Sequence, residues 1–374
     1  MALNPSQDLA WFEQRGAGHT AREIYQQPEC WRQTLGMLAA DEEIRGWLDD
    51  RLANGPRIIF TGAGSSAYIG DALASLLAEA SSLDATAIAT TDIVARPEAS
   101  LKSNRPTLLV SFARSGNSPE SVAAVELADQ LLGDSVNHLV ITCNRQGELA
   151  RWCREHPRAY CVTLPSQTHD QGFAMTSSLS SMLTAAMAVL VPSSQPFLEE
   201  ATRRVEAMLQ GDWNALLPGH GQAFERILIL GSGVLQGLAR EASLKVVELT
   251  AGQVVALSET PLGVRHGPKS LVDENTLVWV WRSALPYTRR YDDDLVAEVA
   301  RDGICGQLEC AGDETASGEA MDELVSGLTA LVRCQVMALF YSLQRGIGAD
   351  NPSPSGHVNR VVQGVTLYPY DVQV

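Results

Sequence analysis

Three ionisable side chains recur at helical spacing in the segment LAREASLKVVEL, residues 238–249. Glu241 and Lys245 are four positions apart and Glu248 follows three positions later, so all three share one face of a helix. Two carboxylates around an ammonium group can tune a general base close to neutral pH. The same spacing is also typical of a routine ion pair on an exposed helix, and the spacing alone favours that simpler interpretation.

One histidine lies in a loop that carries two cations. His266 stands between Arg265 and Lys269 in the segment RHGPKSL. Nearby positive charges disfavour the imidazolium form and keep an imidazole available as a base. A surface histidine without a catalytic role fits these residues equally well. The other histidines form no HxH or HExxH pattern, so the sequence predicts no metal site.

Glycine and serine follow the apolar run at residues 57–61. The segment GAGSSAYIGDAL contains Gly64, Ser65 and Ser66. A glycine turn between a strand and a helix lets backbone amides approach an anion, and the helix dipole favours negative charge there. The spacing is not GxGxxG, so a dinucleotide site is disfavoured. A tight turn without a ligand is the alternative.

A second cluster of this kind follows the apolar run at residues 107–112. In SFARSGNSPESV, Ser118 is a natural N-cap and Pro119 a natural first helical residue. Ser115, Gly116 and Ser118 therefore gather at another helix N-terminus. Two such loops at the carboxyl ends of parallel strands can share one phosphate. An ordinary capped helix is the alternative, and the density of Ser and Gly favours phosphate.

The elements that must position these residues alternate between strand and helix. Near-continuous apolar strands followed by helices predict a parallel sheet covered on both faces. The predicted strands are 57–61, 85–89, 107–112, 138–142, 159–162, 226–230, 253–258 and 276–281. The predicted helices include 67–80, 119–132, 196–209, 238–250 and 321–344.

One strand–turn pattern occurs twice, which predicts two related α/β units. RIIFTGAGS at residues 57–65 matches RILILGSGV at residues 226–234, an offset of 169 residues. Only the first copy is followed by a serine pair, so we expect one half to bind phosphate and the other to supply the chemistry. The expected organisation is a helical extension at 1–50, α/β domains at 51–195 and 196–345, and a tail at 346–374 that closes the site.

The composition is that of an acidic globular chain. Its 374 residues contain 28 Lys and Arg against 44 Asp and Glu, a net charge of −16. This argues against a nucleic-acid or anionic-membrane surface, whereas backbone amides can still bind a small phosphorylated ligand. Seven cysteines without a CxxC pair fit reduced thiols in a cytoplasmic protein. The N-terminus lacks the features of a signal peptide, and the apolar stretch at 182–191 is too short to cross a bilayer.

Together these residues resemble the sugar isomerase (SIS) family of phosphosugar isomerases and binding proteins. GAGSS and SFARSGNSPES resemble its two phosphate-binding loops, and EASLKVVEL followed by RHGP resembles its catalytic helix and histidine loop. The similarity to the isomerase half of glucosamine-6-phosphate synthase extends over nearly the whole chain. Residues 168–178 and 350–369 resemble the bacterial branch of galactosamine-6-phosphate deaminases/isomerases, also called tagatose-6-phosphate ketose/aldose isomerases. The resemblance implies two tandem SIS domains, each a flavodoxin-like αβα sandwich with a parallel sheet.

The resemblance also implies roles for individual residues. Glu248 is the base that moves a proton between C1 and C2, and His266 opens the sugar ring from the partner subunit. Glu241 and Lys245 support the site. The implied phosphate-binding residues are Ser65, Ser66, Arg114, Ser115, Gly116 and Ser118. Further substrate-contact candidates are Gly64, His169, Thr176, Ser177 and Arg360.

The implied reaction converts galactosamine 6-phosphate to tagatose 6-phosphate and ammonia through an enolamine, without a cofactor, in a homodimer or higher homo-oligomer. The tail GVTLYPYDVQV has no lysine, so an imine through a tail lysine, as in the synthase pattern, is not expected. The alternatives are an aldose/ketose phosphate isomerase without deamination, a sugar-phosphate amine deglycase, and a non-catalytic phosphosugar-binding regulator. The acidic residues 1–50 show no convincing helix-turn-helix, which counts against the regulator.

Overall fold

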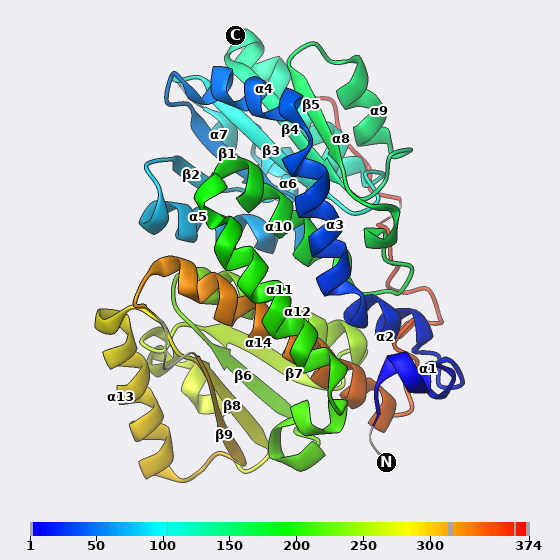
Figure 1. Cartoon of the computed structure of the whole chain (residues 1–374), viewed down its shortest axis with the longest axis vertical. Coiled ribbons are helices and arrows are strands. Elements are labelled where there is room, and N and C mark those ends of the chain that lie inside the picture. Colours follow the sequence, from blue (N-terminus) through cyan, green and yellow to red (C-terminus); the bar gives the residue numbers. More distant parts are fainter. Residues whose placement is uncertain (1–2, 103, 313–316, 363, 372–374) are drawn as a thin grey trace. The chain divides into compact units, whose positions relative to one another are not determined.

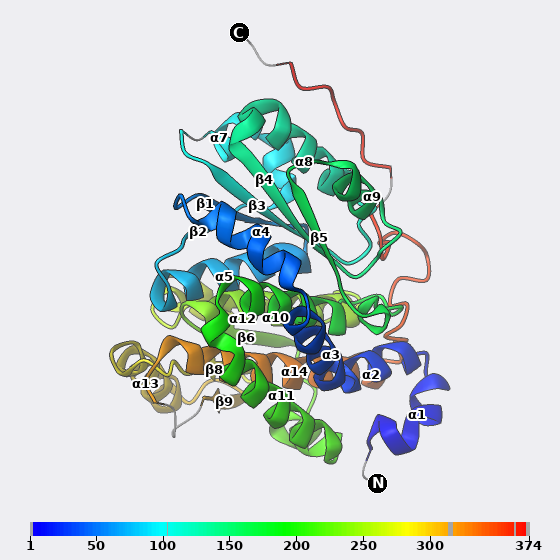
Figure 2. The ribbon, with the colours of Figure 1, turned by 45° about the horizontal axis from the view of Figure 1, so that its top comes forward.

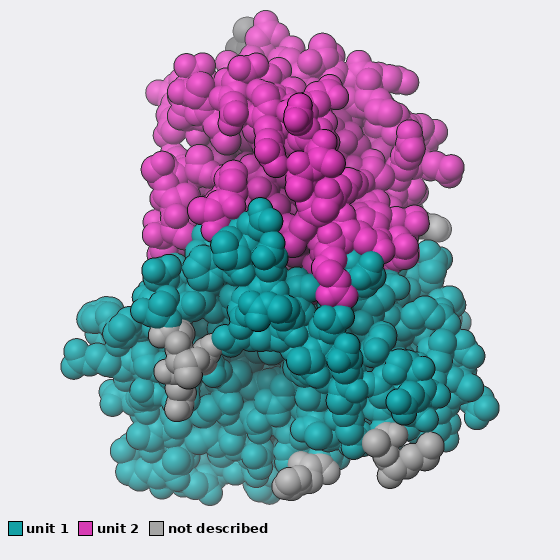
Figure 3. Space-filling model, viewed as in Figure 1, with its two compact units in different colours: residues 1–29, 170–177, 194–357 teal, residues 30–169, 178–193, 358–374 magenta. Residues whose placement is uncertain are grey.

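The computed structural model describes residues 3–102, 104–312, 317–362 and 364–371. They divide into two compact units, shown in teal and magenta in Figure 3. Unit 1 consists of Met1–Glu29, Asp170–Ser177 and Ser194–His357, and unit 2 of Cys30–His169, Ser178–Ser193 and Val358–Val374. The domain boundaries expected after residues 50, 195 and 345 stay a prediction. Residues 363 and 372–374 of the expected tail lie outside the described residues.

Unit 2 is built on a sheet of five parallel strands in the order β2-β1-β3-β4-β5 (Figure 1). This is the flavodoxin-like order, and the predicted parallel sheet is confirmed. The strand order reverses between β1 and β3, and ligands of open α/β sheets bind outside the carboxyl ends of the strands at such a point. The strands are β1 Arg57–Thr61, β2 Asp84–Ala87, β3 Thr107–Ala113, β4 Val136–Thr142 and β5 Ala159–Thr163.

Helices pack on both faces of this sheet. Ile59, Leu109 and Val140 point into a core that residues of α6, α7, α8 and α9 complete. On the opposite face α5 lies against Phe60, and Gly70 permits this approach because a Cβ there would be 2.9 Å from that of Phe60. Figure 2 shows α5 and α8 on opposite sides of the sheet. The helices are α5 Ser65–Ala80, α6 Thr90–Ala95, α7 Pro97–Leu101, α8 Pro119–Leu132 and α9 Glu148–Glu155.

The N-terminal segment is helical and is divided between the units. Helices α1 Pro5–Glu13 and α2 Gly18–Tyr25 belong to unit 1, and α4 Glu42–Leu52 belongs to unit 2. Helices α3 Gln27–Ala39 and α10 Ser177–Leu190 run across the division. The short 3-10 helices are η1 Gly133–Ser135, η2 Ser166–Thr168, η3 Pro192–Ser194, η4 Trp213–Leu216, η5 Pro218–Gly221, η6 Gly263–His266 and η7 Pro268–Leu271.

Unit 1 contains four parallel strands in the order β7-β6-β8-β9 (Figure 1). The strands are β6 Arg226–Leu230, β7 Val255–Glu259, β8 Thr276–Trp281 and β9 Gln307–Ala311. The sequence does not predict β9, because its residues are half-buried or exposed at a sheet edge and form no continuous apolar run. The helices are α11 Gln195–Gln210, α12 Val234–Leu249, α13 Pro286–Asp302 and α14 Ala320–Gln344.

Helix α14 is the central core helix of unit 1. By length and composition it could cross a membrane, but 83% of its most apolar window is buried inside the protein. It packs along α12 and α11, and Arg333 places its guanidinium 5.0 Å from the ring centre of Trp279 in β8. Its apolar residues therefore face other protein segments. The sequence analysis predicted this helix at 321–344, but it considered only residues 182–191 as a stretch that could cross a membrane.

The two glycine turns of the sequence repeat adopt the same backbone geometry. Gly64 has φ 56° and ψ −128° before α5, and Gly233 has φ 59° and ψ −131° before α12. These positive φ values favour glycine. A Cβ on Gly62 or Gly231 would come within 2.6 Å or 2.9 Å of the helix that follows. The predicted repeat is confirmed as two matching strand–turn–helix segments, which begin the helices that carry the candidate site.

Candidate active site

The first serine-rich loop lies at the carboxyl end of β1. Ser65 and Ser66 are the first residues of α5, and each is only 4% exposed. Gly64 precedes them with a backbone conformation that favours glycine. Because β1 and β3 are hydrogen-bonded neighbours, this loop and the one after β3 flank the point where the strand order reverses.

The second loop follows β3 and is held by the loop after β4. Asn144 donates from Nδ2 to the carbonyl of Ser115 at 2.8 Å, and Gly116 has a φ of 65°. Ser118 is the N-cap of α8 and Pro119 its first residue, as predicted, but the Ser118 side chain makes no capping hydrogen bond. The predicted N-cap position is confirmed, and phosphate binding by Ser118 stays a prediction.

Arg114 links the second loop to the C-terminal segment. Its Nη2 donates to the carbonyl of Arg360 at 2.8 Å, and Arg114 is only 7% exposed. The segment is also anchored by Tyr370, whose carbonyl accepts from Gln130 at 2.8 Å and whose hydroxyl donates to Glu98 at 2.6 Å. The structure thus brings Arg360, a predicted substrate contact, next to the predicted phosphate loop through its main chain.

The three ionisable residues of α12 form a buried cluster. Lys245 is completely buried, its Nζ lies 3.3 Å from Oε1 of Glu241, and it donates a hydrogen bond to Oε2 of Glu248. The side chain of Glu241 is 1% exposed and that of Glu248 is 25% exposed. The interpretation as a routine surface ion pair is wrong. Of the three, Glu248 is the residue that a ligand can reach.

The charge of Lys245 is fixed by its two neighbours. Burial by itself lowers the pKa of Lys245, but Glu241 and Glu248 outweigh burial, so the pKa is raised above its ordinary value of 10.5. At neutral pH the side chain is an ammonium group that orients the Glu248 carboxylate. A buried ammonium group has no lone pair with which to attack a substrate carbonyl.

His266 ends the short helix η6 and is exposed. The sequence argument treats its two cationic neighbours, Arg265 and Lys269, without partners. In the structure both of them are paired with carboxylates. Glu298 of α13 accepts hydrogen bonds from both Arg265 and Lys269, and Asp302 also accepts from Lys269. These contacts fix the histidine loop to α13. Glu298 and Asp302 are carboxylate neighbours of this loop that the sequence argument did not include.

Glu23 of α2 anchors the segment 170–177, which the sequence analysis did not connect to it. Its carboxylate accepts hydrogen bonds from the amides of Gln171 and Gly172. A Cβ on Gly172 would lie 2.8 Å from Oε2 of Glu23 and 2.9 Å from Oγ1 of Thr20, so a side chain there would displace one of these groups. Burial, followed by the charge of Asp170, raises the pKa of Glu23 to about 8.

Two predicted substrate contacts take part in the same network. Asp170 accepts from the amide of Thr176 at 2.8 Å and from the hydroxyl of Ser177, and Gln26 donates from Nε2 to Oγ of Ser177 at 3.0 Å. All of Asp170, Thr176 and Ser177 are fully buried. The sequence analysis missed Asp170, although it lies with the two hydroxyl residues in the branch-specific segment. Substrate contact by Thr176 and Ser177 stays a prediction.

Glu23→Gln is expected to flatten the pH dependence of stability. Because its pKa is raised, Glu23 binds a proton in the folded state that the unfolded chain releases. The contribution of Glu23 to stability is therefore fully present below about pH 4.5 and is lost as the pH rises through about 8. The loss is on the order of a few kcal/mol in the wild type. Urea unfolding at about pH 5 and pH 8.5 measures it, with the exposed Glu13→Gln as control. Equal losses in the wild type and Glu23→Gln would contradict the assignment.

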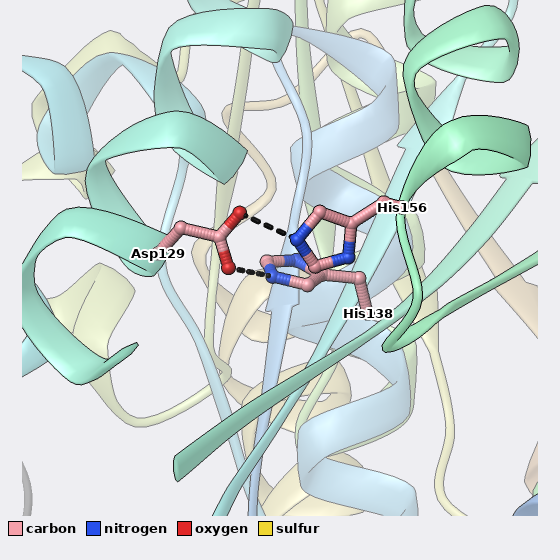
Figure 4. Close-up of side chains that lie close together, drawn as sticks. All are labelled: Asp129, His138 and His156. Atoms are coloured by element: carbon pink, nitrogen blue, oxygen red, sulfur yellow. Dashed lines mark hydrogen bonds and ion pairs between the residues drawn. The ribbon is translucent and has the colours of Figure 1, made fainter. Parts of the chain in front are cut away.

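A cluster of two histidines and one aspartate joins α8, β4 and the segment before β5 (Figure 4). Nε2 of His138 lies 3.1 Å from Oδ1 of Asp129, and Nε2 of His156 lies 2.9 Å from Oδ2. Arg158 also contacts Asp129 at 3.2 Å, and its amide donates to Nδ1 of His156. Burial lowers the pKa of His138 to about 4, so that ring is neutral. Because both imidazoles and a guanidinium already use the carboxylate, we interpret the cluster as structural and not as a metal site.

His169 lies in unit 2, in the wall of a cavity formed by the loops after β4 and β5. Thr176 and Ser177 belong to unit 1. The remaining candidates fall into two groups, each within one unit. The serine-rich loops with Arg114 and Arg360 belong to unit 2, and the α12 cluster with His266 belongs to unit 1.

Each of the two units contains a parallel sheet covered by helices. These sheets, the serine-rich loops at the switch point of unit 2 and the Glu241–Lys245–Glu248 cluster on α12 correspond to the SIS class of sugar isomerases. The SIS domain family matches residues 51–192. The chain is 46% identical over 362 residues to the D-galactosamine-6-phosphate deaminase AgaS of Shewanella sp. (strain ANA-3), with 96% of this chain and 93% of the relative covered. The relative of the same name from Escherichia coli O157:H7 is 43% identical, with 94% and 96% covered.

A solved structure from Escherichia coli, named tagatose-6-phosphate ketose/aldose isomerase, superposes with a TM-score of 0.85 at 39% identity. The match covers 94% of this chain and 96% of that one. The chain belongs to the AgaS family of SIS-domain proteins. The family predicted from the sequence motifs is thereby confirmed.

Proposed function

We propose that this protein converts galactosamine 6-phosphate to tagatose 6-phosphate and ammonia. The observation that carries the proposal is the buried Lys245, which holds the partly exposed carboxylate of Glu248 on α12. A carboxylate fixed by a permanent ammonium group is suited to repeated proton transfer at carbon. The names of the relatives from Shewanella and Escherichia coli agree with this substrate.

In the proposed reaction His266 opens the sugar ring and Glu248 removes the proton from C2. The resulting enolamine takes the proton back at C1, which leaves an imine at C2. Water hydrolyses this imine and releases ammonia. One carboxylate can serve both carbons because they are adjacent. No lysine occurs in residues 346–374, and Lys245 is a buried ammonium group, so the proposal includes no enzyme–substrate imine.

The sugar phosphate is proposed to bind at the switch point of unit 2. Ser66, Ser115 and Ser118, with the amides of Arg114 and Gly116, supply neutral donors at helix N-termini. Ser65, Gly64 and Arg360 adjoin these groups. Contacts to the remote phosphate position the substrate and so lower the barrier at C1 and C2.

Ser118→Ala is expected to raise KM for galactosamine 6-phosphate by about 10-fold or more, since a hydrogen bond to a charged group contributes roughly 1.5–3 kcal/mol. Stability is expected to stay unchanged because the side chain makes no capping bond. The control is galactosamine without the phosphate, for which the variant and the wild type should have equal kcat/KM. An unchanged KM for the phosphorylated sugar would remove Ser118 from the phosphate site.

The second candidate function is aldose/ketose isomerisation without loss of ammonia, favoured by the name of the structure from Escherichia coli. Ammonia release is measured with galactosamine 6-phosphate and glucosamine 6-phosphate, and interconversion is measured with tagatose 6-phosphate. Ammonia from the galacto sugar supports the proposal. Interconversion of tagatose 6-phosphate with its aldose, without any ammonia, would establish the isomerase. Binding without turnover would indicate a regulator.

We also propose two tandem SIS domains in a cytoplasmic homodimer whose sites are shared between subunits. The exposed His266 and the exposed apolar side chains Val247, Val255 and Leu262 belong to neighbouring segments of unit 1 and favour a partner there. Glu248→Gln and His266→Ala should each be inactive alone. Unfolding and refolding them together should restore activity, because one mixed site contains both intact residues. No restoration would argue for sites within one chain.

A further inference from the structure

A cavity of about 620 Å³ lies in unit 2 at the carboxyl ends of β4 and β5. Two arginines and one histidine are part of its lining, and no carboxylate is. Its surroundings therefore favour a negatively charged ligand. The lining residues are Cys143, Asn144, Arg145, Gln146, Arg154, Cys161, Thr163, Leu164, Ser166 and His169.

The two arginines of the lining can be reached by a ligand. Arg145 and Arg154 are exposed, and Nη1 of Arg154 donates to the carbonyl of Arg145 at 2.9 Å. In the part of the chain that the structure describes, no carboxylate is paired with either guanidinium. Arg158, by contrast, contacts both Asp129 and Asp134. Because a guanidinium group binds phosphate through two parallel hydrogen bonds, the two arginines are suited to a phosphate group.

The cavity is separate from the switch point at which the substrate phosphate is proposed to bind. The strands follow one another in the order β3-β4-β5, so β5 lies about 10 Å from β3. None of the serines proposed for the substrate phosphate lines the cavity. Asn144 lies between the two places, since it lines the cavity and donates from Nδ2 to the carbonyl of Ser115 at 2.8 Å. A ligand in the cavity would therefore use a different set of groups.

The rest of the lining is largely polar and uncharged. Gln146, Thr163 and Ser166 contribute amide and hydroxyl groups, which are suited to hydrogen bonds with the hydroxyl groups of a polyol. A volume of about 620 Å³ is typical of pockets for small organic ligands and has room for more than a phosphate group. The lining thus combines cations for a phosphate with neutral donors and acceptors for the remainder of a ligand.

We propose that this cavity is a second anion site, which binds the phosphate monoester of a polyol or sugar. Arg145 and Arg154 bind the phosphate, and Gln146 and Ser166 bind hydroxyl groups. His169, which the sequence analysis grouped with the substrate contacts, then belongs to this second site. The proposal does not depend on the deaminase reaction, because none of these arginines takes part in it.

The test is equilibrium dialysis of the full-length protein with radiolabelled glycerol 3-phosphate at low ionic strength, where charge interactions are least screened. We expect the wild type to bind two molecules per chain, one in the cavity and one at the serine loops. Arg145→Ala/Arg154→Ala should weaken the cavity site by about 10-fold or more and leave the other site unchanged. Ser115→Ala/Ser118→Ala should weaken only the site at the serine loops.

The matched control is Arg96→Ala/Arg151→Ala, which removes two exposed arginines of unit 2 that do not line the cavity. It changes the net charge equally and should bind as the wild type does. Arg145→Ala alone removes a single exposed side chain and should also weaken the cavity site, so the test does not rest on the double variant.

The outcomes separate this proposal from the proposed substrate site. Loss of one site in Arg145→Ala/Arg154→Ala, with no loss in the serine variant, would support the cavity and contradict the serine loops. Wild-type binding by both arginine variants, or equal weakening in the control, would overturn the cavity site. Inorganic phosphate is the competitor that tests the ligand class. If it occupied the cavity as tightly as glycerol 3-phosphate, the assignment of a polyol or sugar ester would be wrong.

Discussion

Glu248→Gln is expected to lower kcat for ammonia release by about 10²- to 10⁴-fold, the usual contribution of a positioned general base. The amide has nearly the shape of the carboxylate and can still accept a hydrogen bond from Lys245. It cannot accept a proton from C2. KM should therefore change little, because the residue is proposed to act on the reacting carbons and not on the phosphate.

The measurement is steady-state ammonia release together with exchange of the C2 hydrogen in deuterated water. Glu126→Gln, an exposed glutamate on α8, is the matched control and should retain wild-type rates. If Glu248→Gln lost ammonia release but kept C2 exchange, a different residue would be the base, and Glu248 would act in a later step.

The strands and the repeat could be predicted because their signals are local. Apolar runs identify β1, β3, β6 and β8, and the strand–glycine–helix pattern around Gly64 and Gly233 occurs twice. The strand β9 could not be predicted, because an edge strand with exposed residues lacks the apolar run that marks central strands.

The types and the spacing of the candidate site residues could be predicted from the sequence, but their burial and their contacts could not. The spacing of Glu241, Lys245 and Glu248 is equally compatible with solvent, and only burial of Lys245 by the rest of unit 1 distinguishes a tuned cluster from a surface pair. The anchoring of residues 170–177 by Glu23 joins positions 148 residues apart in the chain. No local pattern encodes such a contact, so a single sequence leaves Asp170 and Glu23 without an assigned partner.

Lys245→Met is expected to destabilise the protein by about 3–5 kcal/mol, because removing one partner of a buried ion pair leaves uncompensated charge. Glu241 is 1% exposed and would lose the ammonium group 3.3 Å away. Glu248 is partly exposed and can be solvated, so the cost arises mainly at Glu241. The free energy of urea unfolding measures the effect, and activity should fall as well because Glu248 loses the group that orients it.

The double variant Glu241→Gln/Lys245→Met separates the structural effect from the catalytic one. Removing both buried charges should recover much of the stability, since a neutral pair of similar volume avoids the desolvation cost. Activity should stay low, because Glu248 still lacks its ammonium partner. If the double variant recovered activity along with stability, Lys245 would act only by compensating Glu241. If Lys245→Met alone unfolded like the wild type, the buried cluster would contribute nothing to stability, and its burial would require another explanation.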